Sequence, residues 1–239
     1  MAEWIVRLEG NSSEISYLSE LTSKRWKVTK TNSIYYLKSI EFNSFTEAHD
    51  VLEKASNILD ILNGIARLVF GSFQGVKVGG IGRAENNGKP PAQYILPEGI
   101  TTSVRVGTPR ITVILNGREI PQQYNIPGSK WIEVAEEDEK ATKALTLYGG
   151  LEHNWKNLYM ILEVIEDDVG GERKLINKGW TSKGEIKRFK RTADNYRILG
   201  REARHGTEKW DAPREPMSLG DAESLIRNIL DKWLCSKYQ

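Results

Sequence analysis

Cysteine and histidine are scarce in this sequence of 239 residues, which has a single cysteine, Cys235, and three histidines. One cysteine excludes an intramolecular disulfide and a cluster of thiolate metal ligands. The histidines, His49, His153 and His205, lie far apart in the sequence and form no two-histidine helical motif. We therefore expect no metal centre and no bound cofactor.

A strong net charge and long apolar runs are also lacking. The 34 Lys and Arg residues nearly balance the 32 Asp and Glu residues. This balance excludes a global field that would draw the molecule to nucleic acid or to a membrane, so such a role needs a local patch. The longest apolar run, ILNGIARLVF, is interrupted by Asn63, Gly64 and Arg67 and cannot span a membrane. The N-terminus carries charges too early for a signal peptide, and we predict a cytoplasmic protein without a membrane partner.

A glycine-rich stretch, GVKVGGIGRAENNGKPP, invites comparison with phosphate-binding loops. A P-loop has two glycines separated by four residues, then a lysine and a hydroxyl residue. Here five residues separate Gly82 from Gly88, and Lys89 is followed by Pro90. No helical pattern follows, as a dinucleotide fingerprint would require. We therefore predict a strand-to-strand loop and no nucleotide site.

The first half of the sequence predicts strands and one long helix. WIVRLE alternates as a half-buried strand does. RWKVTK and SIYYLKSIEF predict two strands joined by a tight turn at Thr31-Asn32, and ITVILNGREI predicts a hairpin around Asn116-Gly117. Apolar residues between Val51 and Ile65 recur at helical spacing, which predicts a helix that ends near Phe70.

The composition shifts near residue 136, and the remainder predicts helices. The acidic stretch 134–139 suits a helix N-terminus, and Gly149-Gly150 would end that helix. Ser182 with Glu185, and Ser218 with Asp221, predict capping boxes. The further helices are expected at about 151–168, 182–193, 195–205 and 218–237. We predict an α+β fold: a mixed strand and helix domain over 1–135, then an all-helical bundle over 136–239.

A basic segment runs from Lys178 to Arg204 and lies mostly on two predicted helices. On the 182–193 helix, four cations share one face at three- and four-residue spacing. Such a stripe can neutralise a phosphate backbone, and it can equally be a solvated helix face. The candidate nucleic-acid contacts are Lys183, Lys187, Arg188, Lys190, Arg191, Arg197 and Arg204.

The stretch YRILGREARHG combines three arginines with a histidine. If 195–205 is one helix, then Arg197, Arg201 and His205 lie on one face. Histidine can transfer a proton near neutral pH, and arginine can stabilise the charge of a phosphorane. These are the groups that metal-free RNA cleavage needs, so Arg201 and His205 are the candidate catalytic residues. The alternative is that Arg204 and His205 only cap carbonyl groups at a helix C-terminus.

The acidic end of the predicted 151–168 helix is a weaker candidate site. Its carboxylates could hold a magnesium ion or could form a solvated face. No Ser–His–acid pattern can be recognised, and Cys235 lies on a helix with an apolar stripe, which disfavours a nucleophile. The acidic residues are Glu163, Glu166, Asp167 and Asp168.

The helical part resembles the HEPN superfamily of small helical domains. The resemblance covers roughly 145–239 and depends on NWKNLYMILEVIEDD, RTADNYRILGREARHG and PMSLGDAESLIRNILDKWL. HEPN ribonucleases carry an arginine, four to six intervening residues and a histidine. Here three residues separate Arg201 from His205, and seven separate Arg197 from His205. Family members that lack the motif are binding or dimerisation modules.

The resemblance thus implies two different functions. One is a metal-independent endoribonuclease that acts on RNA in stress or phage defence, and the other is a non-catalytic interaction module. A small-ligand sensor in the N-terminal part stays open as a third. We also predict a homodimer, because four short helices should not bury two apolar stripes fully. These stripes are Leu225, Ile229 and Trp233, and Trp155, Leu158, Leu162 and Ile165.

Overall fold

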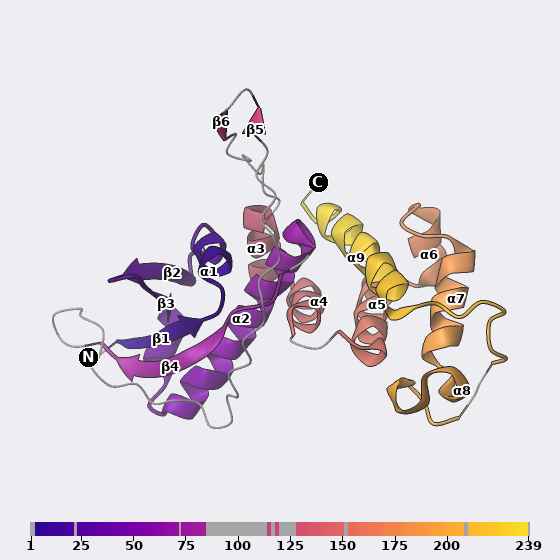
Figure 1. Cartoon of the computed structure of the whole chain (residues 1–239), viewed down its shortest axis with the longest axis horizontal. Coiled ribbons are helices and arrows are strands. Elements are labelled where there is room, and N and C mark those ends of the chain that lie inside the picture. Colours follow the sequence, from indigo (N-terminus) through magenta and orange to yellow (C-terminus); the bar gives the residue numbers. More distant parts are fainter. Residues whose placement is uncertain are drawn as a thin grey trace. The chain divides into compact units, whose positions relative to one another are not determined.

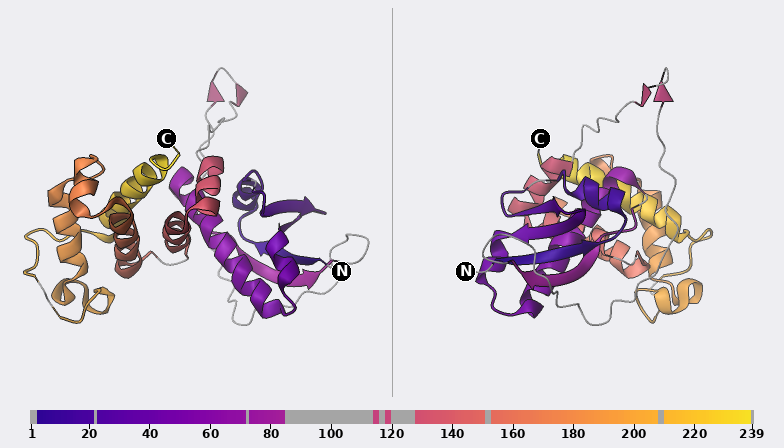
Figure 2. Two further views of the ribbon diagram at one scale, coloured as in Figure 1. Left: turned by 180° about the vertical axis from the view of Figure 1, so that it is seen from behind. Right: turned by 60° about the vertical axis from the view of Figure 1, so that its left-hand side comes forward.

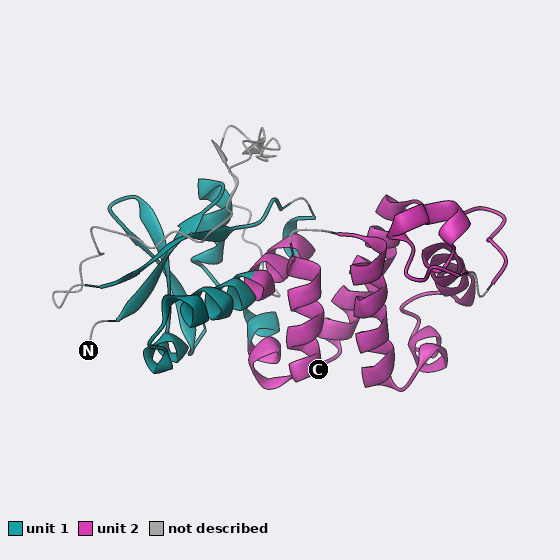
Figure 3. Cartoon of the chain, turned by 90° about the horizontal axis from the view of Figure 1, so that it is seen from below, with its two compact units in different colours: residues 1–59, 69–132 teal, residues 60–68, 133–239 magenta. Residues whose placement is uncertain are grey.

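The computed structural model describes residues 3–21, 23–71, 73–84, 114–115, 118–119, 128–150, 153–207 and 210–238 (Figure 1). The chain divides into unit 1, which contains residues 1–59 and 69–132, and unit 2, which contains residues 60–68 and 133–239 (Figure 3). The predicted α+β class is confirmed, since an antiparallel sheet with helices precedes a mostly helical region. The domain boundary between residues 135 and 136 stays a prediction.

The elements follow the chain in the order of Figure 1. The first are β1 (Trp4–Glu9), α1 (Ser12–Leu18), β2 (Trp26–Thr31), β3 (Ile34–Ser39), the 3-10 helix η1 (Ile40–Ser44), α2 (Ala48–Phe70), β4 (Lys77–Arg83), β5 (Ile114–Leu115) and β6 (Arg118–Glu119). Then come α3 (Gly128–Glu137), α4 (Glu139–Gly149), α5 (Trp155–Val169), α6 (Glu172–Asn177), α7 (Lys183–Ala193), α8 (Tyr196–Leu199), the 3-10 helix η2 (Gly200–Glu202) and α9 (Leu219–Cys235). None of the helices in these described ranges is long and apolar enough to cross a membrane.

The sheet of unit 1 has the strand order β2-β3-β1-β4, with every neighbouring pair antiparallel. The β2–β3 turn lies at Asn32-Ser33, one residue later than predicted, and both residues have positive φ angles. Asparagine tolerates this left-handed conformation, whereas the β-branched Thr31 stays in the strand. The predicted third strand ends at Ser39, because residues 40–44 form η1 instead.

Two other predictions for the first half are confirmed. α2 ends at Phe70, before Gly71 with a φ of 75°, and its first part runs along one face of the sheet (Figure 2). β5 and β6 pair antiparallel on either side of the predicted Asn116-Gly117 turn, although these two residues lie outside the described ones. Gly79, Gly80 and Gly82 lie in β4 rather than in a loop.

In unit 2, α5 packs against α4, α6, α7 and α9. The predicted apolar stripes of α5 and α9 are both buried within one chain. Of the seven residues that form these two stripes, the most exposed is Leu225, at only 7%. The premise of the homodimer prediction was therefore wrong, because α5 and α9 pack against each other and α5 also packs against α4, α6 and α7. The homodimer itself stays a prediction.

The helix starts in unit 2 follow the predicted capping chemistry in most places. Ser182 and Glu185 form the expected capping box at α7, and Ser218 accepts a hydrogen bond from the amide of Asp221 at α9. The prediction that the acidic stretch 134–139 forms a helix N-terminus needs correction. α3 already covers residues 128–137, and Asp138 caps a separate helix, α4. The short helices α1 and α6 were not predicted.

Candidate functional site

The segment 195–205 is not one helix, so the predicted face of Arg197, Arg201 and His205 is wrong. α8 is a single turn, in which the Asn195 side chain accepts a hydrogen bond from the amide of Ile198. Gly200 follows with a φ of 57° and a ψ of −128°, a backbone conformation that favours glycine, and the helix ends there. The chain then forms η2 and becomes extended at Ala203.

This path returns Arg204 and His205 to the end of α7. The Arg204 amide donates a hydrogen bond to the Ala193 carbonyl over 2.9 Å. As a result, Arg204 Nη1 and His205 Nε2 each lie 3.8 Å from Asp194 Oδ1. The Asp194 side chain is 8% exposed, and Oδ1 accepts no hydrogen bond from the residues that the structure describes. A buried carboxylate oxygen thus faces the Arg204 guanidinium and the His205 ring.

Arg204 makes contacts within the fold and is not part of an open phosphate site. Its Nη2 lies 2.5 Å from Glu163 Oε1 on α5, and its guanidinium lies 3.9 Å from the centre of the Tyr159 ring. Together with Asp194, these partners engage Arg204 on several sides. Arg204 is therefore removed from our set of candidate phosphate contacts.

His205 is somewhat more accessible than Arg204, whose side chain is 27% exposed. The His205 side chain is 35% exposed while Nε2 faces the buried Asp194. Arg201 is exposed in η2, and Arg197 is exposed in α8. A carboxylate that accepts a hydrogen bond from one imidazole nitrogen holds the ring in a fixed orientation for proton transfer. The 3.8 Å between Asp194 Oδ1 and His205 Nε2 is an ion-pair distance rather than a hydrogen bond.

The basic face of α7 divides into structural and exposed cations. Lys190 Nζ lies 2.8 Å from both Glu166 and Glu172. Burial alone would lower the pKa of Lys190, but its hydrogen bonds with these glutamates raise it. Arg188 donates hydrogen bonds to the carbonyls of Glu215 and Pro216. The predicted contacts that remain at the surface are Lys183, Lys187, Arg191 and Arg197, with Arg191 partly exposed.

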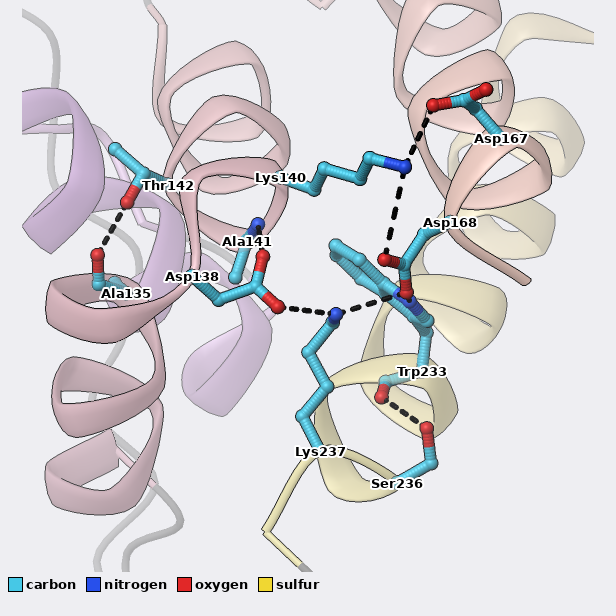
Figure 4. A network of polar contacts seen from close by, with 10 residues as sticks. All are labelled: Ala135, Asp138, Lys140, Ala141, Thr142, Asp167, Asp168, Trp233, Ser236 and Lys237. Carbon is cyan, nitrogen blue, oxygen red and sulfur yellow. Dashed lines mark hydrogen bonds and ion pairs between the residues drawn. The ribbon is translucent and has the colours of Figure 1, made fainter. Parts of the chain in front are cut away.

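The acidic end of α5 is paired with cations from other parts of unit 2. Besides the pairs of Glu163 and Glu166, Asp167 Oδ2 lies 2.7 Å from Lys140 Nζ. Asp168 accepts hydrogen bonds from Trp233 Nε1 and Lys237 Nζ (Figure 4). Among the described residues, no group of three or more His, Cys, Asp or Glu side chains could hold a metal ion. The magnesium interpretation of these carboxylates therefore has no support.

Unit 1 has one cleft that bears on the ligand-sensor interpretation. β1 and β3 pair only through Val6–Leu37 and Arg7–Tyr36. Where they separate, a cleft of about 320 Å³ opens beside α1, lined by apolar residues together with Arg7, Glu9, Ser12 and Ser33. Its volume is at the lower limit for small-molecule pockets. The mixture of one cation and one anion selects no class of ligand.

Comparison of the chain with protein-family models, with curated proteins and with solved structures finds no match. The functional argument thus depends on the residues themselves. The sequence interpretation missed Asp194, since its approach to His205 depends on the return of the chain to the end of α7, where the Arg204 amide bonds to the Ala193 carbonyl. The pair Asp194-Asn195 at the end of a predicted helix was the available signal, because both residue types favour helix ends and turns.

Proposed function

We propose that unit 2 is a metal-independent endoribonuclease in which His205 transfers protons and Asp194 orients its ring. The observation that supports this proposal is the 3.8 Å approach of the half-exposed His205 imidazole to the buried Asp194 carboxylate. Arg201 is the cation for the transition state, since Arg204 is engaged by Glu163 and Tyr159. Lys183, Lys187, Arg191 and Arg197 bind the phosphate backbone.

The proposed chemistry is an internal transesterification. His205 takes the proton from a ribose 2′-hydroxyl as the 2′-oxygen forms a bond to phosphorus. The bond from phosphorus to the 5′-oxygen breaks, that oxygen takes a proton from solvent water, and His205 then releases its own proton to solvent. The products are a 2′,3′-cyclic phosphate and a 5′-hydroxyl. Arg201 stabilises the additional negative charge of the phosphorane.

The test is cleavage of end-labelled RNA by the full chain and its variants. His205→Ala should reduce the rate by at least about two orders of magnitude, as loss of a general acid or base does. Asp194→Asn should lower kcat at nearly unchanged KM and change the pH profile of the rate, which a merely structural role would not do. His49→Ala is the matched control, because His49 is exposed in α2.

Two outcomes contradict the proposal. Activity that is lost in excess chelator and recovered with magnesium would require a metal mechanism, since the proposed one proceeds in chelator. A wild-type chain that leaves RNA intact, with a His205→Ala variant that only melts at a lower temperature, would favour the non-catalytic interaction module.

A further inference from the structure

The strand β2 lies at an edge of the sheet, and no strand that the structure describes pairs with its outer side (Figure 1). On the inner side, β2 pairs with β3 over all six of its residues, without the register shift that interrupts the pairing of β1 with β4. A regular outer strand presents a row of N–H and C=O groups that a further strand can bind. The outer edge of β2 is therefore a candidate interaction surface.

One hydrogen bond shows which backbone groups of β2 point outward. The Ile40 amide donates to the Arg25 carbonyl over 2.9 Å, so these two residues form a hydrogen-bonded pair just before β2, in register with it. Hydrogen-bonded and non-bonded pairs alternate along two antiparallel strands. Val28 and Lys30 therefore direct their N–H and C=O groups away from β3, to the outer edge. The Trp26 amide, in the same phase, donates to a side-chain hydroxyl rather than to β3.

The hairpin formed by β2 and β3 is basic and contains no acid. Residues 21–40 include five Lys or Arg residues and no Asp or Glu. One of the five, Lys38, pairs with Glu3. Of the two flanking acids, Glu20 and Glu41, the second pairs with Lys54. The other four cations make no ion pair with the residues that the structure describes. All four are exposed, namely Lys24, Arg25, Lys27 and Lys30.

These charges decide which kind of strand the edge can accept. Lysine on an outer strand opposes edge-to-edge pairing of two copies of a chain, because like charges would meet. The same lysines attract a strand that carries acids, since opposite charges directly across a sheet contribute favourably. A phosphate backbone would use the cations but would leave the outward C=O groups without donors. The combination therefore favours an acidic peptide over a second copy and over RNA.

We propose that the outer edge of β2 binds an extended acidic segment of a partner protein as an additional antiparallel strand. The site lies within unit 1, so the inference goes beyond the proposed function of unit 2 and does not depend on it. Lys27 and Lys30 are three residues apart and thus lie on opposite faces of the sheet. The bound segment therefore carries two acids at the same spacing, with a β-branched apolar residue across from the buried Val28.

The binding test measures the fluorescence anisotropy of a labelled peptide mixed with the full chain. The probe is Thr-Glu-Thr-Val-Glu-Val-Asp-Asp, whose glutamates lie across from Lys30 and Lys27 in antiparallel pairing. A peptide with lysine in place of every acid should not bind. A peptide with proline in place of both valines keeps the charge but lacks two N–H donors, so it should bind at least about tenfold more weakly.

Two substitutions at Lys30 separate its charge from its backbone. Lys30→Ala removes only the charge and should weaken binding about threefold. Lys30→Pro also removes the outward N–H without breaking a bond to β3, and it should weaken binding at least about tenfold. Lys27→Glu should weaken binding about tenfold, and a peptide with lysine across from residue 27 should restore it. Lys187→Ala is the control, since Lys187 is exposed in unit 2.

Amide hydrogen exchange gives a second readout, which charge attraction alone would not change. In the free chain, the amides of Val28 and Lys30 should exchange faster than those of Lys27 and Thr29, which bond to β3. The peptide should slow the exchange at Val28 and Lys30. Because this measurement uses the wild-type chain, it decides the matter even if Lys30→Pro does not fold.

Three outcomes would overturn the additional strand. The first is a chain that does not bind the acidic peptide. The second is equal affinity for the valine and proline peptides without protection of the Val28 and Lys30 amides, which would reduce the edge to a charged surface. The third is an oligouridine that binds more tightly than the peptide with the same dependence on Lys27, which would assign the hairpin to nucleic acid.

Discussion

Gly149 of α4 lies directly against the carbonyl oxygen of Asp60 in α2. A Cβ built on Gly149 would overlap that oxygen, and a Cβ built on Gly64 would overlap the carbonyl oxygen of Leu145. The two helices therefore cross backbone to backbone, and each contributes one glycine to the crossing. A side chain at either position would push the helices apart, because backbone atoms cannot rotate away as a flexible side chain can.

We predict that Gly149→Ala destabilises the fold by about 3 kcal/mol or more, at the upper end of the range for overpacking. Urea denaturation gives the change in the free energy of unfolding. Gly184→Ala in α7 is the matched control, since the nearest atom to its Cβ would be 3.9 Å away. Alanine favours a helix over glycine by about 1 kcal/mol, so this variant should be neutral or more stable. Equal losses in the two variants would refute the crossing.

The carboxyl group of Asp60 makes the stability of unit 2 depend on pH. Burial raises the pKa of Asp60 to about 6, although the neighbouring Arg67 works in the opposite direction. The folded state thus binds a proton at Asp60 more tightly than the unfolded state does. The contribution of this group to the free energy of unfolding is therefore lost as pH rises toward the pKa that Asp60 has in the folded state. Asp60→Asn removes the buried charge. It should raise the denaturation midpoint above that of wild type at about pH 8 and not at about pH 4.

The exposed Glu53 in the same helix provides the control for Asp60. Glu53→Gln removes the same charge from an exposed side chain, so it should leave the denaturation midpoint near that of wild type. Denaturation of the three chains at both pH values tests the comparison. A midpoint for Asp60→Asn that stays above wild type by the same amount at both pH values would contradict the role of the charge.

These features show where sequence patterns suffice and where they do not. Periodicity located α2, α5, α7 and α9, because each has an apolar face that must be buried. It could not place Gly64 opposite Gly149, since helical periodicity says nothing about which helices cross. In the candidate site, α8 ends at Leu199 and the chain returns to the end of α7, so Asp194 lies near His205 while Arg197 and Arg201 do not share one helix.

The C-terminal end of the chain is tied to unit 2 by Lys237. Its Nζ lies 2.6 Å from Asp138 Oδ2 and 2.9 Å from Asp168 Oδ2 (Figure 4). Burial would raise the pKa of Asp138, but the hydrogen bonds from Lys237 and from the Ala141 amide outweigh it and lower the pKa. A carboxyl group whose pKa is lower in the folded state stabilises the fold at pH values above its pKa in the unfolded state. This contribution is lost as pH falls through its pKa in the folded state.

Lys237→Met should therefore cost about 1 kcal/mol at neutral pH, near the upper end for a partly exposed ion pair. The difference from wild type should shrink as acid protonates Asp138. Lys187→Met, which changes an exposed lysine of α7, should have little effect at any pH. Thermal melting across the acidic range measures both. A penalty for Lys237→Met that stays constant into strong acid would show that packing, not charge, holds the C-terminal end.

Arg204 and Arg201 are three residues apart, yet the structure gives them opposite roles. Arg204 contacts the Tyr159 ring and pairs with Glu163 and the buried Asp194. Arg201 is exposed in η2. Arg204→Ala removes a cation from above an aromatic ring and leaves a buried carboxylate with less compensation. We expect it to destabilise the fold by about 2 to 4 kcal/mol.

Arg204→Lys should recover only part of this loss, because lysine lacks the planar fork that stacks on the ring and pairs with two groups at once. Arg201→Ala should change stability by less than about 0.5 kcal/mol, as exposed substitutions usually do. If Arg201 acts on RNA, its alanine variant should instead reduce the rate of cleavage while the melting temperature stays the same. Melting and cleavage measured on both variants therefore decide the assignment. A stable Arg204→Ala chain together with an unstable Arg201→Ala chain would reverse it, and the proposed site would then need a different cation for the transition state.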